Sequence, residues 1–432
     1  MPANMSSMDP LFKDDYGPVF TSELNNSTPS LDWFEKVDDV RWQGRVHIEP
    51  IHVNRNRGSY WSQEGGGFPT AANQQLEWLR IPCRYFHGMC RFTVQAIKAS
   101  QTDKGAFARL MRLEMDNLLK DMRVQRNFAI WGDGRGVRAF VNEGTPTGNT
   151  TLELDAPAGI AGATHGTRFL NVGDNIVFVV PATGALSFAA TRLVTAVNAD
   201  GTDVTLDAAP GTGAADNDFI VKASGAATSA VIGNSDWMNM AMGIRGIVDS
   251  GGVVNNYFGL SRATFPILQA YTVPTAGAIS ADLIQRAIDT AGSMGGGNID
   301  KHAMSYDTRR ELLTIMENDR RYSHEYLMKP DAGTKVAGDY KANLTFGGVP
   351  VFCDHFAPFG EWYGLNTGSF RRASMTDGEW ADETGAVLTQ VSGQVDTYEA
   401  LYRIYENYYA LNPNQCFRLS GISTNVVVAQ VV

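Results

Sequence analysis

The sequence has few cysteines for its length and no long apolar run. Its 432 residues include four cysteines, which are too few and too scattered for a disulfide framework, so we expect reduced thiols. No stretch approaches the roughly 18 consecutive apolar residues of a membrane-spanning helix, and the N-terminal segment is acidic, without the apolar core of a signal peptide. We therefore expect a protein that is made and kept in the cytoplasm and has no membrane partner.

Common catalytic motifs are also missing. The sequence contains no Gly-x-Ser-x-Gly elbow, Walker loop or His-Glu-x-x-His helix. The glycine-rich segment 132–136 follows a predicted helix, whereas a phosphate-cradling loop must lead into one, so we interpret it as a helix-ending turn. The densest group of potential metal ligands is Cys353, Asp354 and His355. It lacks a second cysteine pair, which favours polar residues at a strand end.

Length and charge limit the remaining classes. A chain of 432 residues exceeds one ordinary core, so several packed regions are expected. The hydrophobic content of 44% and charged content of 19% are typical of a folded protein. The formal net charge of −10 argues against a protein that wraps DNA with a basic surface. A nucleic acid partner would be enclosed rather than gripped.

The first part of the chain predicts extended elements. Residues 1–36 are polar with isolated aromatic side chains, and they indicate an arm that orders on a neighbouring molecule. Two β-like runs, 45–53 and 75–81, flank a polar, glycine-rich stretch. They predict a long projecting hairpin. At Pro50 the apolar residues of the first strand change from one face to the other, which is typical of an exposed or edge strand.

The rest of the chain predicts an α+β protein with an insertion. Residues 103–130 carry one apolar stripe at helical spacing and form the strongest predicted helix. Residues 145–232, rich in Gly, Ala, Thr, Asp and Val, predict a small β-barrel or sandwich inserted into a host domain. Ser280 is expected to cap a helix. Residues 386–422 favour strands, although a helix over 398–409 is left open.

This order of elements resembles the Hong Kong 97-like fold of the major capsid proteins of tailed bacteriophages. Several segments look like parts of that family, in the same order and within residues 37–422: 245–252, 309–313, 318–321, 346–351 and 398–413. The resemblance implies a non-enzymatic shell subunit that forms hexamers and pentamers around double-stranded DNA. It also implies assembly in the host cytoplasm and a final location in the virion.

The resemblance divides the chain as follows: N-terminal arm 1–36, E-loop 37–82, peripheral domain with a spine helix 83–144, β-rich insertion 145–232, axial domain 233–390, and returning peripheral strands 391–432. The sequence departs from the family in the insertion and in its lack of a long N-terminal scaffolding segment. A separate scaffolding protein is therefore expected, with a portal and a decoration protein as further candidate partners. The expected inter-subunit contacts are Trp33, Phe34, Arg55, Arg57, Tyr60, Trp61, Arg320 and Arg321.

Three alternatives remain open from the sequence. The first is an encapsulin-type cellular compartment, which shares the fold but carries enzyme cargo. The second is a metal-dependent enzyme that uses Cys353, Asp354 and His355; otherwise no catalytic residue, cofactor or metal site is assigned. The third concerns only the insertion 145–232, which would be a binding module on the capsid exterior whose deletion leaves assembly intact.

Overall fold

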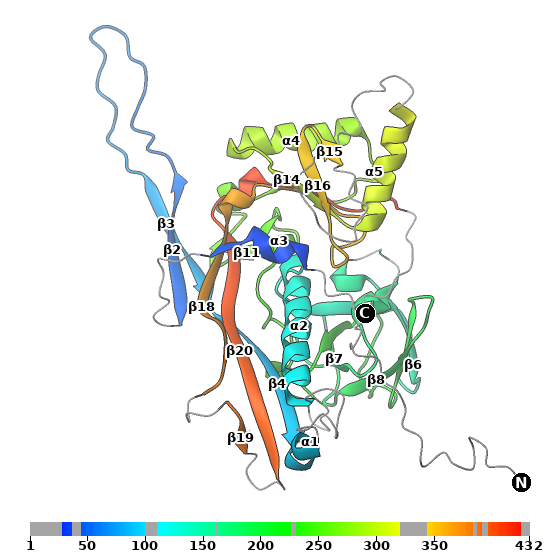
Figure 1. Cartoon of the computed structure of the whole chain (residues 1–432). Coiled ribbons are helices and arrows are strands. Elements are labelled where there is room, and N and C mark those ends of the chain that lie inside the picture. The colour runs from blue at the N-terminus through cyan, green and yellow to red at the C-terminus, as the bar shows by residue number, and fades with distance from the viewer. Residues whose placement is uncertain are drawn as a thin grey trace, which may run out of the picture.

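The computed structural model describes residues 28–36, 45–99, 110–160, 163, 165–225, 230–319, 344–382, 387–390 and 396–424. These residues form two large sheets, a closed barrel, a long hairpin and a short ribbon of β11 (Asn256–Tyr257) and β12 (Leu260–Ser261) (Figure 1). Their α-helices are α1 (Val94–Ala99), α2 (Leu110–Trp131), α3 (Ile244–Ile247), α4 (Ala281–Gly295) and α5 (Tyr306–Asp319). Among the described helices, none combines the length and the apolar character needed to cross a membrane.

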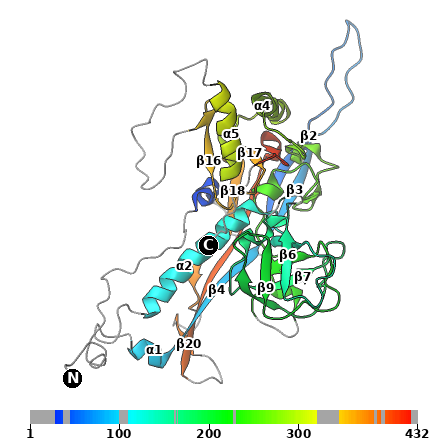
Figure 2. The same cartoon turned by 90° about the vertical axis from the view of Figure 1, so that its right-hand side faces the viewer.

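A long sheet forms one side of the molecule. Its strands are β1 (Glu35–Lys36), β18 (Phe370–Trp380), β20 (Thr397–Ala410), β19 (Thr389–Gln390) and β4 (Arg84–Thr93). Helix α2 runs along β4 and β20 (Figure 2). Gly88 allows the close approach, because a Cβ atom at this position would force the Met122 side chain to move. The helix predicted over 103–130 is confirmed from residue 110 onward, and its first part, 103–109, lies outside the described residues. Residues 398–409 form a strand rather than the alternative helix.

The predicted hairpin consists of β2 (Val46–Asn54) and β3 (Gln75–Pro82), joined by residues 55–74, which we call the tip loop. It projects away from the rest of the chain (Figure 1). Pro50 lies opposite Trp78 in an unbroken register, and the shift occurs only between His52 and Asn54. Because the register is unbroken, the apolar residues change face across Pro50 as predicted: Ile48 is exposed on the face of Trp78, whereas Ile51 packs against the main core. A two-stranded ribbon has free edges, where a residue without an N–H is tolerated.

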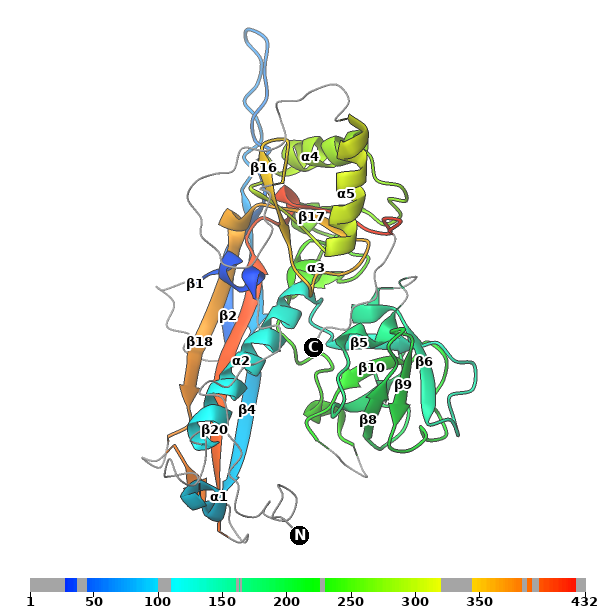
Figure 3. The same cartoon turned by 45° about the vertical axis from the view of Figure 1, so that its right-hand side comes forward.

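The insertion forms a closed barrel with the strand order β10-β5-β6-β9-β8-β7. Its strands are β5 (Val137–Val141), β6 (Thr151–Asp155), β7 (Asn175–Val179), β8 (Arg192–Val197), β9 (Asp203–Leu206) and β10 (Phe219–Lys222). The barrel lies to one side of the long sheet and α2 (Figure 3). It begins at β5, ahead of the boundary expected at residue 145, because the apolar run of β5 precedes the change in composition.

A second, mixed sheet carries helices α4 and α5. Its strands are β13 (Tyr271–Val273), β21 (Phe417–Leu419), β17 (Trp362–Leu365), β14 (Lys301–Met304), β16 (Val349–Cys353) and β15 (Thr345–Phe346). Met304 and Trp362 pack in one core with the apolar faces of α4 and α5. On the other face, Ala303 and Tyr363 join the main core of the molecule. The sheet thus separates two hydrophobic cores.

Helix α4 begins at the predicted cap, because the Ser280 hydroxyl accepts a hydrogen bond from the Leu283 N–H at 3.2 Å. We expect Ser280→Ala to lower the free energy of unfolding by about 1 kcal/mol, since a helix N–H would lose its acceptor. Chemical denaturation followed by circular dichroism measures the change. Ser293→Ala, in the last turn of the same helix, is the matched control and should change stability by less than about 0.5 kcal/mol. Equal losses in both variants would contradict a capping role.

Candidate assembly surfaces and the buried ion network

The tip loop presents aromatic side chains to solvent. It carries four of the predicted contact residues: Arg55, Arg57, Tyr60 and Trp61, all exposed. The Trp61 side chain is fully exposed, and so is that of Phe68, which the sequence analysis missed. A lone aromatic residue directly after three glycines was the available signal. Two fully exposed aromatic rings at one end of a hairpin are typical of a binding surface rather than of a free monomer surface.

Internal hydrogen bonds brace the tip loop. The Asn56 side-chain amide donates to the carbonyl oxygen of Ala72, and the Tyr60 hydroxyl donates to that of Gly67. Each bond joins the outgoing and returning arms of the loop. Such bracing reduces the conformational entropy that is lost when the loop binds a partner.

The stem of the hairpin continues the apolar surface. On its outer face Ile48, Leu76 and Trp78 are about half exposed or more, whereas Leu79 and Ile81 on the other face are fully buried. The alternation follows from the period of two in a strand. One face therefore anchors the hairpin to the molecule and leaves the other free to contact a neighbouring molecule.

The structure buries two residues that were expected to contact other subunits. Trp33 packs edge-on against Trp131, with 5.9 Å between ring centroids, and Phe34 stacks on Phe370 at 5.0 Å. Both lie in the main core of their own chain. The prediction of inter-subunit contacts by Trp33 and Phe34 is therefore wrong. Strand β1 follows them and pairs in parallel with β18, so this end of the expected arm orders on its own subunit.

The other expected pair, Arg320 and Arg321, follows α5 directly and lies in the range 320–343, outside the described residues. Their expected contact role stays a prediction.

Asp354, one of the three candidate metal ligands, joins separate parts of the chain. Its carboxylate accepts hydrogen bonds from the Asn127 amide at 2.9 and 3.2 Å, from the Ser30 hydroxyl and from the Phe356 N–H. These donors come from α2, the N-terminal segment and the turn after β16. Within the described residues, no group of three or more His, Cys, Asp or Glu side chains could hold a metal ion. The contacts assign Asp354 a structural role.

The segment 245–252 contributes to a buried network of charges. Arg245 lies 3.3 Å from a carboxylate oxygen of Asp133 and 3.5 Å from one of Glu361. Asp133 stands in the glycine-rich turn after α2, where Gly134 has a φ of 84°, as expected for a helix-ending turn. The network therefore ties the end of α2 to the second sheet.

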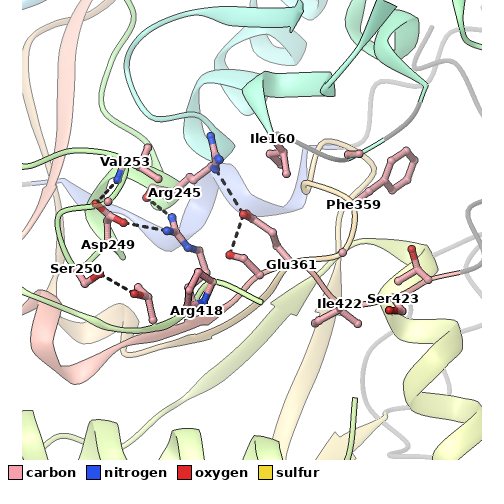
Figure 4. Close-up of a pocket in the computed structure, with 18 residues that line it drawn as sticks. Ile160, Arg245, Asp249, Ser250, Val253, Phe359, Glu361, Arg418, Ile422 and Ser423 are labelled. Atoms are coloured by element: carbon pink, nitrogen blue, oxygen red, sulfur yellow. Dashed lines mark hydrogen bonds and ion pairs between the residues drawn. The ribbon is translucent and has the colours of Figure 1, made fainter. Parts of the chain in front are cut away.

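Asp249 is the other acidic centre of this network. Its carboxylate lies 2.9 Å from Arg418 (Figure 4) and 3.3 Å from Arg262. The same carboxylate accepts hydrogen bonds from backbone N–H groups of the following loop, including that of Val254. Burial alone would raise the pKa of Asp249, but the backbone donors and Arg418 outweigh it, so the pKa is lowered. Because the partners stand far apart in the sequence, spacing could not reveal this cluster.

Aromatic contacts dock the barrel on the rest of the subunit. Phe169 of the insertion forms a three-ring cluster with Phe128 of α2 and Phe356, whose ring centroids are 5.1 and 6.1 Å from its own. Arg168 stacks on Phe359 and donates to the carbonyl oxygen of His355. Deletion of residues 145–232 would leave β5 without its barrel partners and uncover Phe128. The structure thus favours a barrel that is integral to the subunit over a removable module.

We expect Phe169→Leu to loosen this docking and to cost about 1 kcal/mol, the value of a buried aromatic contact. Amide hydrogen exchange should become faster in the last turns of α2 as well as in the barrel. Phe188→Leu is the matched control, because Phe188 contacts Phe178 within the barrel. That variant should speed exchange only in the barrel. An unchanged rate in α2 for Phe169→Leu would show that the contact does not couple the two parts.

Comparisons with known proteins identify the fold. No family model matches the sequence, and no curated protein does. The structure resembles the capsid asymmetric unit of cyanophage A-1(L), with a TM-score of 0.55 and 10% identity over 96% of this chain and 98% of that one. A capsid of a native GTA particle also matches, with a TM-score of 0.49 and 10% identity over 96% of each chain.

The cyanophage likeness extends over nearly the whole length of both chains. The protein therefore has the α+β, Hong Kong 97-like fold of a phage capsid subunit. The fold predicted from the order of elements is confirmed.

Proposed function

We propose that this chain is the major capsid protein of a tailed bacteriophage and assembles into an icosahedral head shell around double-stranded DNA. The observation that carries the proposal is a braced hairpin with fully exposed Trp61 and Phe68 on a capsid fold. A closed shell needs heterologous contacts made by elements that reach neighbouring subunits. The projecting hairpin is suited to this task.

Assembly through many copies would compensate for weak single contacts. In hexamers and pentamers each subunit would contact one neighbour with its own hairpin and bind the hairpin of another. The several weak contacts around one subunit would together give a high avidity. The buried ion network and the barrel contacts would hold the body of the subunit together while the hairpin reaches a neighbour. The division into E-loop, peripheral domain, insertion and axial domain is part of this proposal, as are the separate scaffolding protein, portal and decoration protein.

The charge of the chain is consistent with DNA that is enclosed rather than bound. A net charge of −10 gives little general attraction to phosphates. We place the protein in the virion, after assembly in the host cytoplasm. An encapsulin-type compartment is the second candidate, because it shares the fold. The contents of purified particles distinguish them: nuclease-protected double-stranded DNA supports the phage shell, and a packaged enzyme supports the compartment.

Expression of the full chain, alone and together with the products of its neighbouring genes, tests assembly. We expect rapidly sedimenting particles with this chain as the main component. Material that stays monomeric under every condition would overturn the proposal.

A further inference from the structure

One edge of the hairpin is open to a further strand. The Arg80 N–H points away from β2 and donates to the Phe258 carbonyl oxygen at 2.9 Å. Because the N–H groups of successive strand residues point to alternate edges, those of Trp78 and Leu76 face the same way as that of Arg80. Neither has a hydrogen-bond partner on that side among the described residues. The β3 strand therefore presents an unpaired edge next to the β11–β12 ribbon.

The opposite edge of the hairpin is closed by Pro50. This residue lies directly opposite Trp78, so its position also faces away from the partner strand. Proline has no N–H to donate there, and it is one of the residues that keep an edge strand from pairing with other chains. The asymmetry favours a partner on the β3 edge over one on the β2 edge.

A groove of about 380 Å³ lies along the open edge. Its lining combines apolar side chains and a glycine with one charged group of each sign: Leu76, Trp78, Leu260, Gly259, Glu77 and Arg80. Open space surrounds the position where Gly259 would carry a Cβ atom. Tyr257 anchors the ribbon side of the groove, because its ring is fully buried and its hydroxyl donates to the Ala410 carbonyl oxygen at 3.1 Å. The groove is therefore already formed in the single subunit.

The tip loop is chemically complementary to this edge. It carries the fully exposed rings of Trp61 and Phe68 and two exposed guanidinium groups, Arg55 and Arg57. Within the described residues, no ion pair involves these arginines or Glu77 of the groove. Neither arm of the tip loop belongs to a strand of its own subunit, so the main chain of an arm is available to pair with an edge strand.

We propose that the open β3 edge and its groove bind the tip loop of a second copy of this chain, an inference that rests on the proposed capsid function. One arm of the loop adds to β3 as a strand, an aromatic ring enters the groove, and a tip-loop arginine pairs with Glu77. The occupant comes from another copy, because the tip loop of the same subunit projects away from β3 (Figure 1).

The size of this contact suits an array of subunits rather than a dimer. Two aromatic rings bury about 300–500 Å² on one side, which is less than the roughly 800 Å² per partner of a stable pair. Because the tip loop and the groove are different surfaces, each copy binds one neighbour and is bound by another, so the contacts propagate head to tail. Many such contacts in a closed particle stabilise one another.

Leu76→Pro tests strand addition, because it removes an N–H that the hairpin itself does not use. We expect this variant to unfold thermally like the original chain but to lower the yield of particles about tenfold or more. Leu76→Val, which keeps the N–H and has a side chain of similar size to proline, is the matched control and should give a normal yield. A normal yield from Leu76→Pro, or an equal loss from Leu76→Val, would overturn strand addition.

Cross-linking in assembled particles decides the case if Leu76→Pro disturbs the fold. Gln63→Cys in the tip loop and Leu260→Cys in the groove are combined with Cys90→Ser and Cys353→Ser, since Cys90 and Cys353 are the partly exposed native thiols in the described residues. We expect a short bifunctional thiol reagent to join copies into dimers and longer chains. Gln63→Cys with Val172→Cys is the control, because Val172 is 64% exposed on the barrel.

The outcomes separate this site from the capsid function. Links within one chain, an equal yield in the control, or no links in particles that have formed would overturn the β3 site and leave the capsid function standing. Failure of the original chain to form particles under any condition would contradict the capsid function itself, and this inference with it.

Discussion

Asp249→Ala is expected to lower the free energy of unfolding by about 3–5 kcal/mol, the loss typical when a buried charge loses its partner. Arg262, which is fully buried, and Arg418 would both be left without this carboxylate. The loop after Asp249 would lose the acceptor for its N–H groups as well. Denaturation followed by circular dichroism measures the loss.

Asp282→Ala is the matched control for Asp249→Ala. Asp282 also pairs with an arginine, Arg286, but the two side chains are 78% and 65% exposed. Such a surface pair contributes less than about 1 kcal/mol. Similar losses in the two variants would show that burial of the Asp249 network is not what stabilises the subunit.

The effect of Asp249→Ala should also depend on pH. The pKa of Asp249 in the folded chain lies below its ordinary value of 3.8. A carboxyl group with a lowered folded pKa stabilises the fold fully above its unfolded pKa and loses that contribution as the pH falls through the folded value. The stability difference between the original chain and Asp249→Ala should therefore be larger at pH 7 than at pH 3. A difference that grows in acid would contradict the assigned charge state.

The double variant Trp61→Ser/Phe68→Ser should fold normally but fail to form particles. Both side chains are fully exposed in the subunit, so their removal costs no internal packing. Aromatic anchors at an interface contribute about 2 kcal/mol or more each, a factor of roughly 30 in each contact's equilibrium constant. This loss of binding free energy would occur at every hairpin contact of a shell. Thermal unfolding reports the fold, and sedimentation reports assembly.

Gln63→Ala lies in the same tip loop and serves as the control for this variant. Gln63 is exposed and polar, and its backbone carbonyl, which accepts the Gly66 N–H, is retained in the variant. Polar residues at the edge of an interface contribute little. We expect particles from Gln63→Ala in normal yield. Normal particles from the double variant would exclude the aromatic tip as a major contact, and a misfolded double variant would contradict its exposure.

Local features were predictable because neighbouring residues determine them. The serine cap of α4, the helix-ending turn after α2 and the two strands of the hairpin each follow from a short pattern. The overall fold followed from the order of such elements together with the resemblance. The insertion was recognised by its composition, but its first strand, β5, was placed outside it because β5 has the composition of an ordinary core strand.

Long-range packing was not predictable from local patterns. Trp33 and Phe34 stand in a polar segment that indicated an arm, yet their ring partners are Trp131 and Phe370, far along the chain. A lone aromatic residue in such a segment can be a core residue, as Trp33 is, or an exposed one, as Phe68 is. Only the position of the partner decides, and the sequence does not reveal it.

Cryo-electron microscopy of assembled particles tests most directly whether the hairpin joins subunits of a capsid. We expect a closed icosahedral shell in which the tip loop lies on an adjacent subunit, with Trp61 and Phe68 buried between the two chains. A shell whose tip loops point into solvent, or material that never forms a closed particle, would contradict the proposed role.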